Sequence, residues 1–574
     1  MRHHYYIGIL CILLAMVGTA SADVWEFTDS YDTLAMQGML TFDENGILNG
    51  AVVAGTDNGV MDVNQHAETG NGEVLVYQSG NIEGNSGFAT TAARDGSGNS
   101  GGTFASFTAG GMCFGQVSAA GEIPEEFIPD PPLESSGDQL SQVGTTSSSI
   151  NGVIAGQFVG IEGNSGYAST GARNVNGASG QSTASFTEGG MFVGQVSGAG
   201  EMTSFKSYGT QISVPFGIES TASFSSQSGE IRAGSGSAST SGSTVHGALA
   251  GSDVSFTEGS IRFRQWNRGD STTFNEVLGL GDVAPWSNSE DIRSYQSVDS
   301  ESFSTIGASS YSRLPDESFV QVDAEARGSG TPITNQLSKP SPGSSFDVDD
   351  QYAGSGLQFN PSTGMGLGST GAFDIHQRSY QDVSIYGVQS GSAGASAGTS
   401  DGNSASTLMY VEQGSLVSPD VWASTDRYDY RNLLGDGVLG DTGGSGSEAE
   451  AGYYDTHISG MSGGLLLDSQ NPKDYAYSHW GFSEGGTLTS DRGYVLAGSQ
   501  NDIHLIQMGL NQSISGDPRV QVSGDDRNKD LNYHYSITLN GELNEIDYKN
   551  IYERELGPGS TESVTQTIEI YIDL

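Results

Sequence analysis

An internal duplication constrains the fold of this chain more than any other feature. Residues 82–122 and residues 161–201 align without a gap at an offset of 79, and 27 of their 41 positions are identical. Both copies are rich in Gly, Ser, Thr and Ala. Duplication of such a small-residue unit is typical of an extended β architecture in which each repeat stacks on the next. We predict an all-β, elongated repeat architecture, either a β-solenoid or stacked hairpin sheets, with a more conventional C-terminal β domain.

Composition agrees with this fold class. The chain has 574 residues, of which 84 are glycine, and its hydrophobic fraction is 35%. A core is therefore available, but it must be built largely from small side chains, which favours thin, layered β structure. No window shows sustained apolar spacing of the helical kind, and Gly or Ser interrupts most candidates.

The repeat unit alternates as a half-buried strand does. Ser182, Ala184 and Phe186 share one face, and Thr and Ser residues occupy the other. Glu188 and two glycines follow, and residues 191–196 then return as a second strand. We predict a β-hairpin with a glycine turn in each copy. The first copy has the same pattern in residues 104–108, 110–111 and 112–117.

Another hairpin is predicted near the N-terminus. The apolar segment 39–42 is followed by residues 43–46, which end in Asn45-Gly46, and the chain continues with Ile47 and Leu48. The Asn-Gly pair supplies the positive φ angles that tight hairpin turns need.

The rest of the chain divides by composition and by weaker echoes of the repeat. Residues 255–259 echo 185–189, and a fainter trace lies in 384–416. The low-complexity segments 234–243 and 390–404 are compatible with loops or with small-residue strands. The predicted units are a signal peptide (1–22), an N-terminal β segment (23–80), repeat copy 1 (81–122), a proline-rich acidic linker (123–134), copy 2 (135–201), a diverged copy 3 (202–290), a Gly/Ser-rich β region (291–446) and the C-terminal β domain (447–574).

Net charge excludes one class of partner. The chain carries 22 Lys and Arg against 68 Asp and Glu, a formal net charge of −46. Nucleic-acid binding needs basic patches, so we predict no nucleic-acid partner. An acidic surface of this kind remains soluble and can be bridged by divalent cations.

The N-terminus has the pattern of a secretory signal. Arg2 precedes the apolar run 7–17, and Ala20-Ser21-Ala22 supplies a small-residue cleavage site. No later stretch approaches the roughly 18 apolar residues that span a membrane. We predict a secreted protein, extracellular or at the cell surface, with no membrane span after removal of the signal.

One cysteine remains after that removal. Cys11 leaves with the signal, and the repeat counterpart of Cys113 is Phe192, so the position favours an apolar side chain. We expect a buried free thiol at Cys113, with an intermolecular disulfide as the alternative.

No catalytic constellation is apparent in the sequence, and we predict that the protein is not an enzyme. Gly-x-Ser-x-Gly in a strand–turn–helix setting does not occur, and the few His residues are scattered singly. A β-helix polysaccharide-degrading enzyme stays open as an alternative, because such enzymes recruit carboxylates from neighbouring coils.

Two acidic clusters are candidate calcium ligands, since hard cations prefer oxygen donors. Neither cluster fits the twelve-residue helix–loop–helix pattern, and solvated acidic loops are the alternative. No other cofactor is predicted. The candidate ligands are Asp347, Asp349, Asp350, Asp525, Asp526 and Asp530.

The last predicted strand is a candidate assembly element. Val564, Ile568, Ile570 and Ile572 share one face of residues 564–574. The strand either closes its own sheet or is donated to a neighbouring subunit, because free edges with high β propensity seek partners.

Four tryptophans are either a glycan-stacking platform or ordinary sheet packing: Trp266, Trp286, Trp422 and Trp480.

The repeated Ile-Glu-Gly-Asn-Ser-Gly segment and the Phe-Thr-x-Gly-Gly-Met segment carry a resemblance. In composition and repeat texture the chain resembles secreted, acidic, Gly/Ser/Thr-rich surface proteins of prokaryotes, including sheath and adhesin-like proteins of methanogenic archaea. The resemblance implies a structural or adhesive role in the cell envelope, with self-association or other envelope proteins as partners. A structural subunit of an extracellular layer is the first hypothesis, and a surface adhesin or glycan-binding module is the alternative.

Overall fold

The structure is a computed structural model, and every regular element that it describes is a β-strand. It describes residues 24–31, 33–43, 45–70, 73–123, 150–206, 216–275, 286–328, 344–362, 370–432, 445–472, 475–498, 503–507, 513–525, 533–539, 542–548 and 568–571. The strands are β1 (Val24–Tyr31), β2 (Leu34–Phe42), β3 (Leu48–Asp57), β4 (Val60–Gly70), β5 (Glu73–Arg94), β6 (Ser100–Ile123), β7 (Ile150–Arg173), β8 (Ser179–Lys206), β9 (Phe216–Ser243), β10 (Leu249–Asn275), β11 (Trp286–Ser302), β12 (Thr305–Arg313), β13 (Phe319–Arg327), β14 (Ser345–Ser362), β15 (Thr370–Gly398), β16 (Ser404–Asn432), β17 (Ser445–Gly460), β18 (Ser462–Gln470), β19 (Tyr475–Gly498), β20 (Ile503–Gln507), β21 (Ser513–Asp525), β22 (Tyr533–Leu539), β23 (Glu542–Tyr548) and β24 (Ile568–Tyr571). The prediction of an elongated all-β repeat fold is confirmed.

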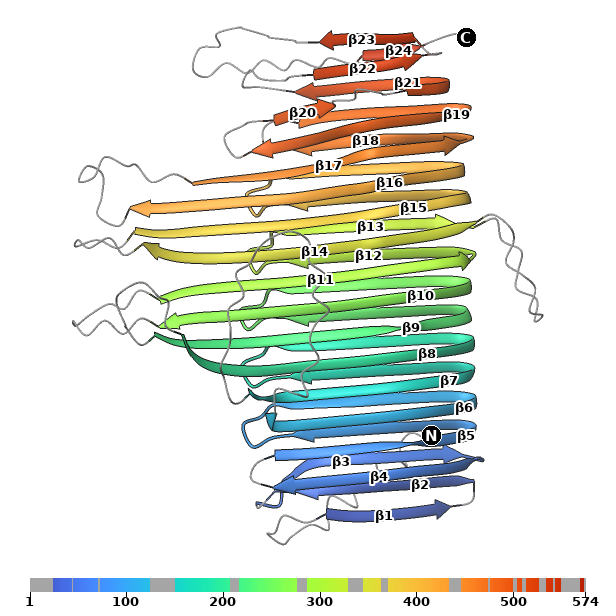
Figure 1. The fold of residues 1–574 in the computed structure, drawn as a ribbon, viewed down its shortest axis with the longest axis vertical. Helices are drawn as coiled ribbons and strands as arrows, with labels where there is room; N and C mark the ends of the chain where they lie inside the picture. Colours follow the sequence, from blue (N-terminus) through green and yellow to red (C-terminus); the bar gives the residue numbers. More distant parts are fainter. Residues whose placement is uncertain are drawn as a thin grey trace.

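The longest strands are U-shaped, and their two halves lie in two facing layers. β8 pairs with β7 on both sides of a bend at Glu188, whose φ is 55°. Figure 1 shows these strands stacked along the long axis of the molecule, with the bends gathered at its right-hand side. Each U-shaped strand thus adds one rung to both layers.

This arrangement corrects the predicted glycine hairpin. Residues 182–187 and 191–196 do not pair with each other, because both segments belong to the single strand β8 and both pair with β7 and β9. Glu188 has a positive φ, and the chain bends there so that the inward side chains of the two halves of β8 face each other. The backbone amides of both halves pair with the neighbouring strands instead. Ser182, Ala184 and Phe186 are buried between the layers, as their alternation predicted.

We call the two layers A and B. Every strand pair within them is antiparallel, apart from a single parallel bridge between β21 and β22. Layer A contains, in order, β4, first half of β5, second half of β6, first half of β7, second half of β8, first half of β9, second half of β10, β11, β14, first half of β15, second half of β16, β17, second half of β19 and β20. Layer B contains β1, β2, β3, the other halves of the U-shaped strands, β12, β13, β18, the second part of β21, and β24.

Tight turns in layer B connect β5 to β6 and β7 to β8. Asp95 N–H donates to Asn99 O at 3.1 Å, and Asn174 N–H donates to Ala178 O at 3.0 Å. Gly98 and Gly177 in these turns have φ of 103° and 101°, which favours glycine. The predicted Asn45-Gly46 hairpin is confirmed between β2 and β3, with Gly46 at φ 74°.

The weaker echoes of the repeat occupy the same place in the fold as the firm copies. Glu258 in β10 and Gln413 in β16 have φ of 50° and 48°, and both mark bends equivalent to that at Glu188. The low-complexity segments are strands: residues 234–243 belong to β9, and residues 390–398 belong to β15. Their small side chains allow the close approach of neighbouring strands.

The core is a long strip between the two layers. One cluster of buried apolar residues runs from Ala54 on β3 to Val495 on β19. The bulkier residues of the C-terminal region join this strip, since Leu465 and Trp480 are buried in it. β17 and β18 pair with β16, and β19 pairs with β17 and β18. Within the described ranges no helix is long and apolar enough to cross a membrane.

Candidate functional site: a buried glutamine ladder and open strand edges

A ladder of glutamine side chains runs through the core along the long axis. Each member lies on the inner face of layer A, directly beside the next one on the neighbouring strand. From Gln65 to Gln296, each Nε2 donates to the Oε1 of the next glutamine at 2.6 to 3.0 Å. The members are Gln65, Gln78, Gln116, Gln157, Gln195, Gln227, Gln265, Gln296, Gln351 and Gln381.

The same amides tie the two layers together. Gln78 Nε2 also donates to Thr90 O at 2.9 Å, and Gln381 Nε2 donates to Gly394 O at 3.0 Å. Both acceptors are backbone carbonyls of layer B. Because carbonyls only accept, they fix which end of each amide faces them, and the whole ladder has one direction: donation runs towards the C-terminus.

The two ends of the ladder differ. At the C-terminal end, Gln381 Nε2 is satisfied by Gly394 O and by Asp323 O at 2.9 Å. At the N-terminal end, Gln65 Nε2 donates to Gln37 O at 3.1 Å, but Gln65 Oε1 is buried without a hydrogen-bond partner among the described residues. A buried unpaired acceptor costs about 1–3 kcal/mol of stability. The outer edge of β4 therefore lacks a hydrogen-bond donor for Gln65 Oε1.

Glycines at the bends allow neighbouring rungs to come into backbone contact. A Cβ at Gly110 would lie 1.9 Å from Glu162 O, and one at Gly189 would lie 2.1 Å from Arg232 O. Gly259 and Gly414 are similarly close to the carbonyls of Ser302 and Ser459. The glycine of the Phe-Thr-x-Gly segment therefore sets how closely neighbouring strands can stack at the bends.

The first acidic cluster lies on β14 and extends over its neighbours. Asp347 is paired by register with Asp299 on β11, and Asp349 with Asp382 on β15. Asp350 lies at an irregularity in the pairing of β14 with β15, with φ 51°, and its Oδ1 accepts from the Tyr295 hydroxyl at 2.9 Å. Sequence reasoning missed Asp299 and Asp382, because they come together with β14 only through strand pairing.

These neighbours perturb the titration of Asp347. Burial first, and then the carboxylates of Asp349, Asp299 and Asp382, raise the pKa of Asp347 to about 6. Among the residues that the structure describes, no group of three or more His, Cys, Asp or Glu side chains is placed to hold a metal ion. Calcium binding here stays a prediction.

We expect Asp347→Asn to stabilise the protein at pH 7 by roughly 1 kcal/mol, a value discounted for the partial exposure of the side chain. The folded state raises this pKa above the unfolded value, so the protein binds the proton more tightly when folded. The contribution of Asp347 to stability therefore increases as pH falls from about 6 towards 4. Urea unfolding of both proteins at pH 7.5 and 4.5 checks this, and a mutant effect of equal size at both pH values would contradict it.

The other predicted site residues are only partly covered by the structure. Asp525 is the last residue of β21, whereas Asp526 and Asp530 lie outside the described residues. Ile568 and Ile570 belong to β24, which pairs antiparallel with β21 of the same chain. Val564 and Ile572 lie outside the described residues, as does the predicted signal peptide.

Apolar side chains gather on the outer face of layer A over β5–β8. Phe158 and Phe192 are 50% and 54% exposed, and their rings meet edge to face at 4.5 Å. Cys113 lies on the same face and is exposed, so the expectation of a buried thiol is wrong. Its alternating position on β6 turns it outwards, between the buried Met112 and Phe114.

The tryptophans do not form one platform. Trp480 is buried in the core, whereas Trp266 stacks on Tyr295 at 5.8 Å between ring centroids. Trp422 is on β16, and the side chain of Trp286 is not among those described.

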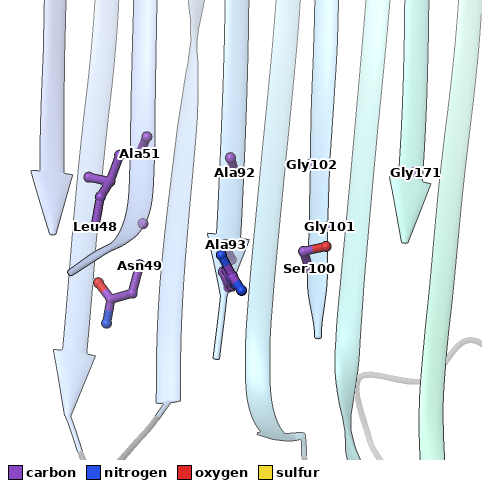
Figure 2. A pocket seen from close by; sticks show the side chains of 11 residues that line it. Leu48, Asn49, Ala51, Ala92, Ala93, Ser100, Gly101, Gly102 and Gly171 are labelled. Carbon is purple, nitrogen blue, oxygen red and sulfur yellow. The ribbon is translucent and has the colours of Figure 1, made fainter. Parts of the chain in front are cut away.

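A hollow of about 450 Å³ opens near the turns of β3, β5 and β6. Figure 2 shows that small residues such as Ala51, Ala92 and Gly101 line it, so it offers few groups for chemistry.

Sequence reasoning missed the glutamine ladder, although a signal for it is present. Gln78 and Gln157, and likewise Gln116 and Gln195, are separated by the repeat offset of 79. A buried polar side chain retained in both copies at an inward position indicates a ladder.

No family model matches the chain, and the comparisons with curated proteins and with solved structures found no match either.

Proposed function

We propose that the protein is a secreted structural subunit of an extracellular layer, sheath or matrix, which assembles through its β-strand edges. The observation that carries the proposal is that the stack ends in strands paired on one side only. β1 pairs only with β2, and β4 pairs only with β5, among the described strands. Edges of this kind recruit further strands.

The interior supports a mechanical role. The ladder from Gln65 to Gln381 links the strands of layer A to one another and to the carbonyls of layer B. Each layer A strand from β4 to β15 therefore carries side-chain hydrogen bonds in addition to its backbone ladder. Load applied along the long axis is shared among these bonds. The acidic surface keeps lateral contacts dependent on cations such as calcium.

An adhesive or glycan-binding role is the second candidate. Exposed aromatic side chains on one outer face favour it, because flat faces with Phe and Tyr can stack on sugar rings. Phe158, Phe192 and Tyr77 contribute to that face at 50%, 54% and 44% exposure. In this reading the stack is a rigid support that displays the face to glycans or to other envelope proteins.

Electron microscopy of the purified protein, with calcium and with a chelator, tests the proposal. We expect ordered filaments, sheets or tubes that become wider when calcium is present. Dispersed rods that bind a glycan array would support the adhesive role instead. Release of reducing sugar from an acidic polysaccharide would overturn both and indicate an enzyme.

A further inference from the structure

Among the described strands, none pairs with the outer edge of β4 at the N-terminal end of layer A. Gln65 Nε2 reaches Gln37 O on β2, so β4 lies against β2, while β1 extends layer B beyond them. The outer edge of β4 therefore lies beside the inner face of β1. Figure 1 shows β1 beyond β2 and β4 at this end. A further extended strand that paired with β4 would cover the inner face of β1.

The occupant of this position must bring a hydrogen-bond donor. Gln65 Oε1 is buried and has no partner among the described residues, whereas Oε1 of Gln78 and of each later member accepts from the preceding glutamine. The amide cannot turn around, because its Nε2 is held by Gln37 O and Gln78 Oε1. A second copy that approached edge to edge, β4 against β4, would place one acceptor against another.

The opposite end of the stack offers strands with the required direction. By register the ladder row continues from Gln381 through Val421, Tyr453 and Gly493 to Gln507 on β20. The first residues of β21 also pair with the second half of β19 in layer A. β22 is bridged to them through Ser513↔Thr538, and β23 pairs with β22. The C-terminal end thus extends layer A, the layer that is short at the N-terminal end.

From these observations we infer that copies of this chain associate head to tail: the C-terminal end of one copy fills the layer A position beside β4 of the next and donates to Gln65 Oε1. The inference rests on the proposed assembly through strand edges and specifies its polarity. A head-to-tail contact of this kind is heterologous and does not close on itself, so it produces filaments rather than dimers. The ladder direction is then the same throughout the filament.

Energy transfer between labelled copies tests the polarity. In a Cys11→Ser, Cys113→Ser background, Asn64→Cys on β4 labels the N-terminal end, and Glu545→Cys on β23 labels the C-terminal end. We expect transfer when copies labelled at opposite ends are mixed. No transfer is expected between two copies labelled at Asn64, because fourteen layer A strands at roughly 4.8 Å separate those labels by about 70 Å.

Two variants with the same substitution provide a second readout. Gln65→Leu is expected to weaken association roughly five-fold, because the incoming donor loses its acceptor. Gln227→Leu breaks the ladder in its middle and leaves both ends intact, so its association constant is expected to be unchanged.

Each result has one meaning. Transfer between two Asn64 labels would overturn the inference in favour of a head-to-head pair, while the proposed function would survive. Filaments without transfer between opposite ends would indicate lateral assembly and would also overturn it. Absence of any assembly by microscopy would remove the proposed function and the inference together.

Discussion

Replacing Gln195 by leucine is expected to lower the free energy of unfolding by about 3 kcal/mol. The side chain is 1% exposed, and it accepts from Gln157 at 2.7 Å and donates to Gln227 at 2.9 Å. It also donates to Ala168 O at 3.4 Å. Leucine fills a similar volume but leaves the Gln227 acceptor and the Gln157 donor without their partner. Urea unfolding followed by circular dichroism measures the loss.

A matched control lies on the same strand. Gln181 is exposed on the outer face of β8, and Gln181→Leu makes the same chemical change away from the ladder. We expect it to change stability by no more than about 0.5 kcal/mol. Equal effects of Gln181→Leu and Gln195→Leu would mean that the ladder contributes little to the fold.

Adding one methyl group at a bend is expected to have a comparable effect. A Cβ at Gly189 would stand 2.1 Å from Arg232 O and 2.7 Å from Ala233 Cα, both backbone atoms of the next rung. Neither can move without separating β8 from β9, so Gly189→Ala is expected to cost about 3 kcal/mol. Thermal unfolding of the purified variant provides the measurement.

Gly194 on the same strand supplies the control for this substitution. The nearest atom to a Cβ there is Phe158 Cδ2 at 3.8 Å, an ordinary contact distance. Gly194→Ala should be neutral or stabilise by about 0.5 kcal/mol, because alanine loses less backbone entropy on folding. If Gly189→Ala were also tolerated, the close packing of the bends would be refuted.

Some of the candidate site could have been found from the sequence. Retention of Gln116 and Gln195 at the repeat offset is visible in the alignment of the two copies. The pairing of Asp349 with Asp382 is not, because it depends on register between strands that belong to no shared repeat. The exposure of Cys113 follows from alternation only after the inward face of β6 is known.

By itself the sequence determined the all-β class, the stacking of repeated units, the alternation at Ser182, Ala184 and Phe186, and the Asn45-Gly46 turn. These depend on side-chain periodicity and on backbone preferences within a few residues. Only the tertiary structure decided that Glu188-Gly189-Gly190 is a bend between layers and not a hairpin turn. The same local conformation serves either arrangement, and the choice depends on whether the flanking segments find partners in each other or in neighbouring strands. In this chain β7 and β9 supply those partners along both halves of β8, and the ladder through Gln195 follows from that pairing.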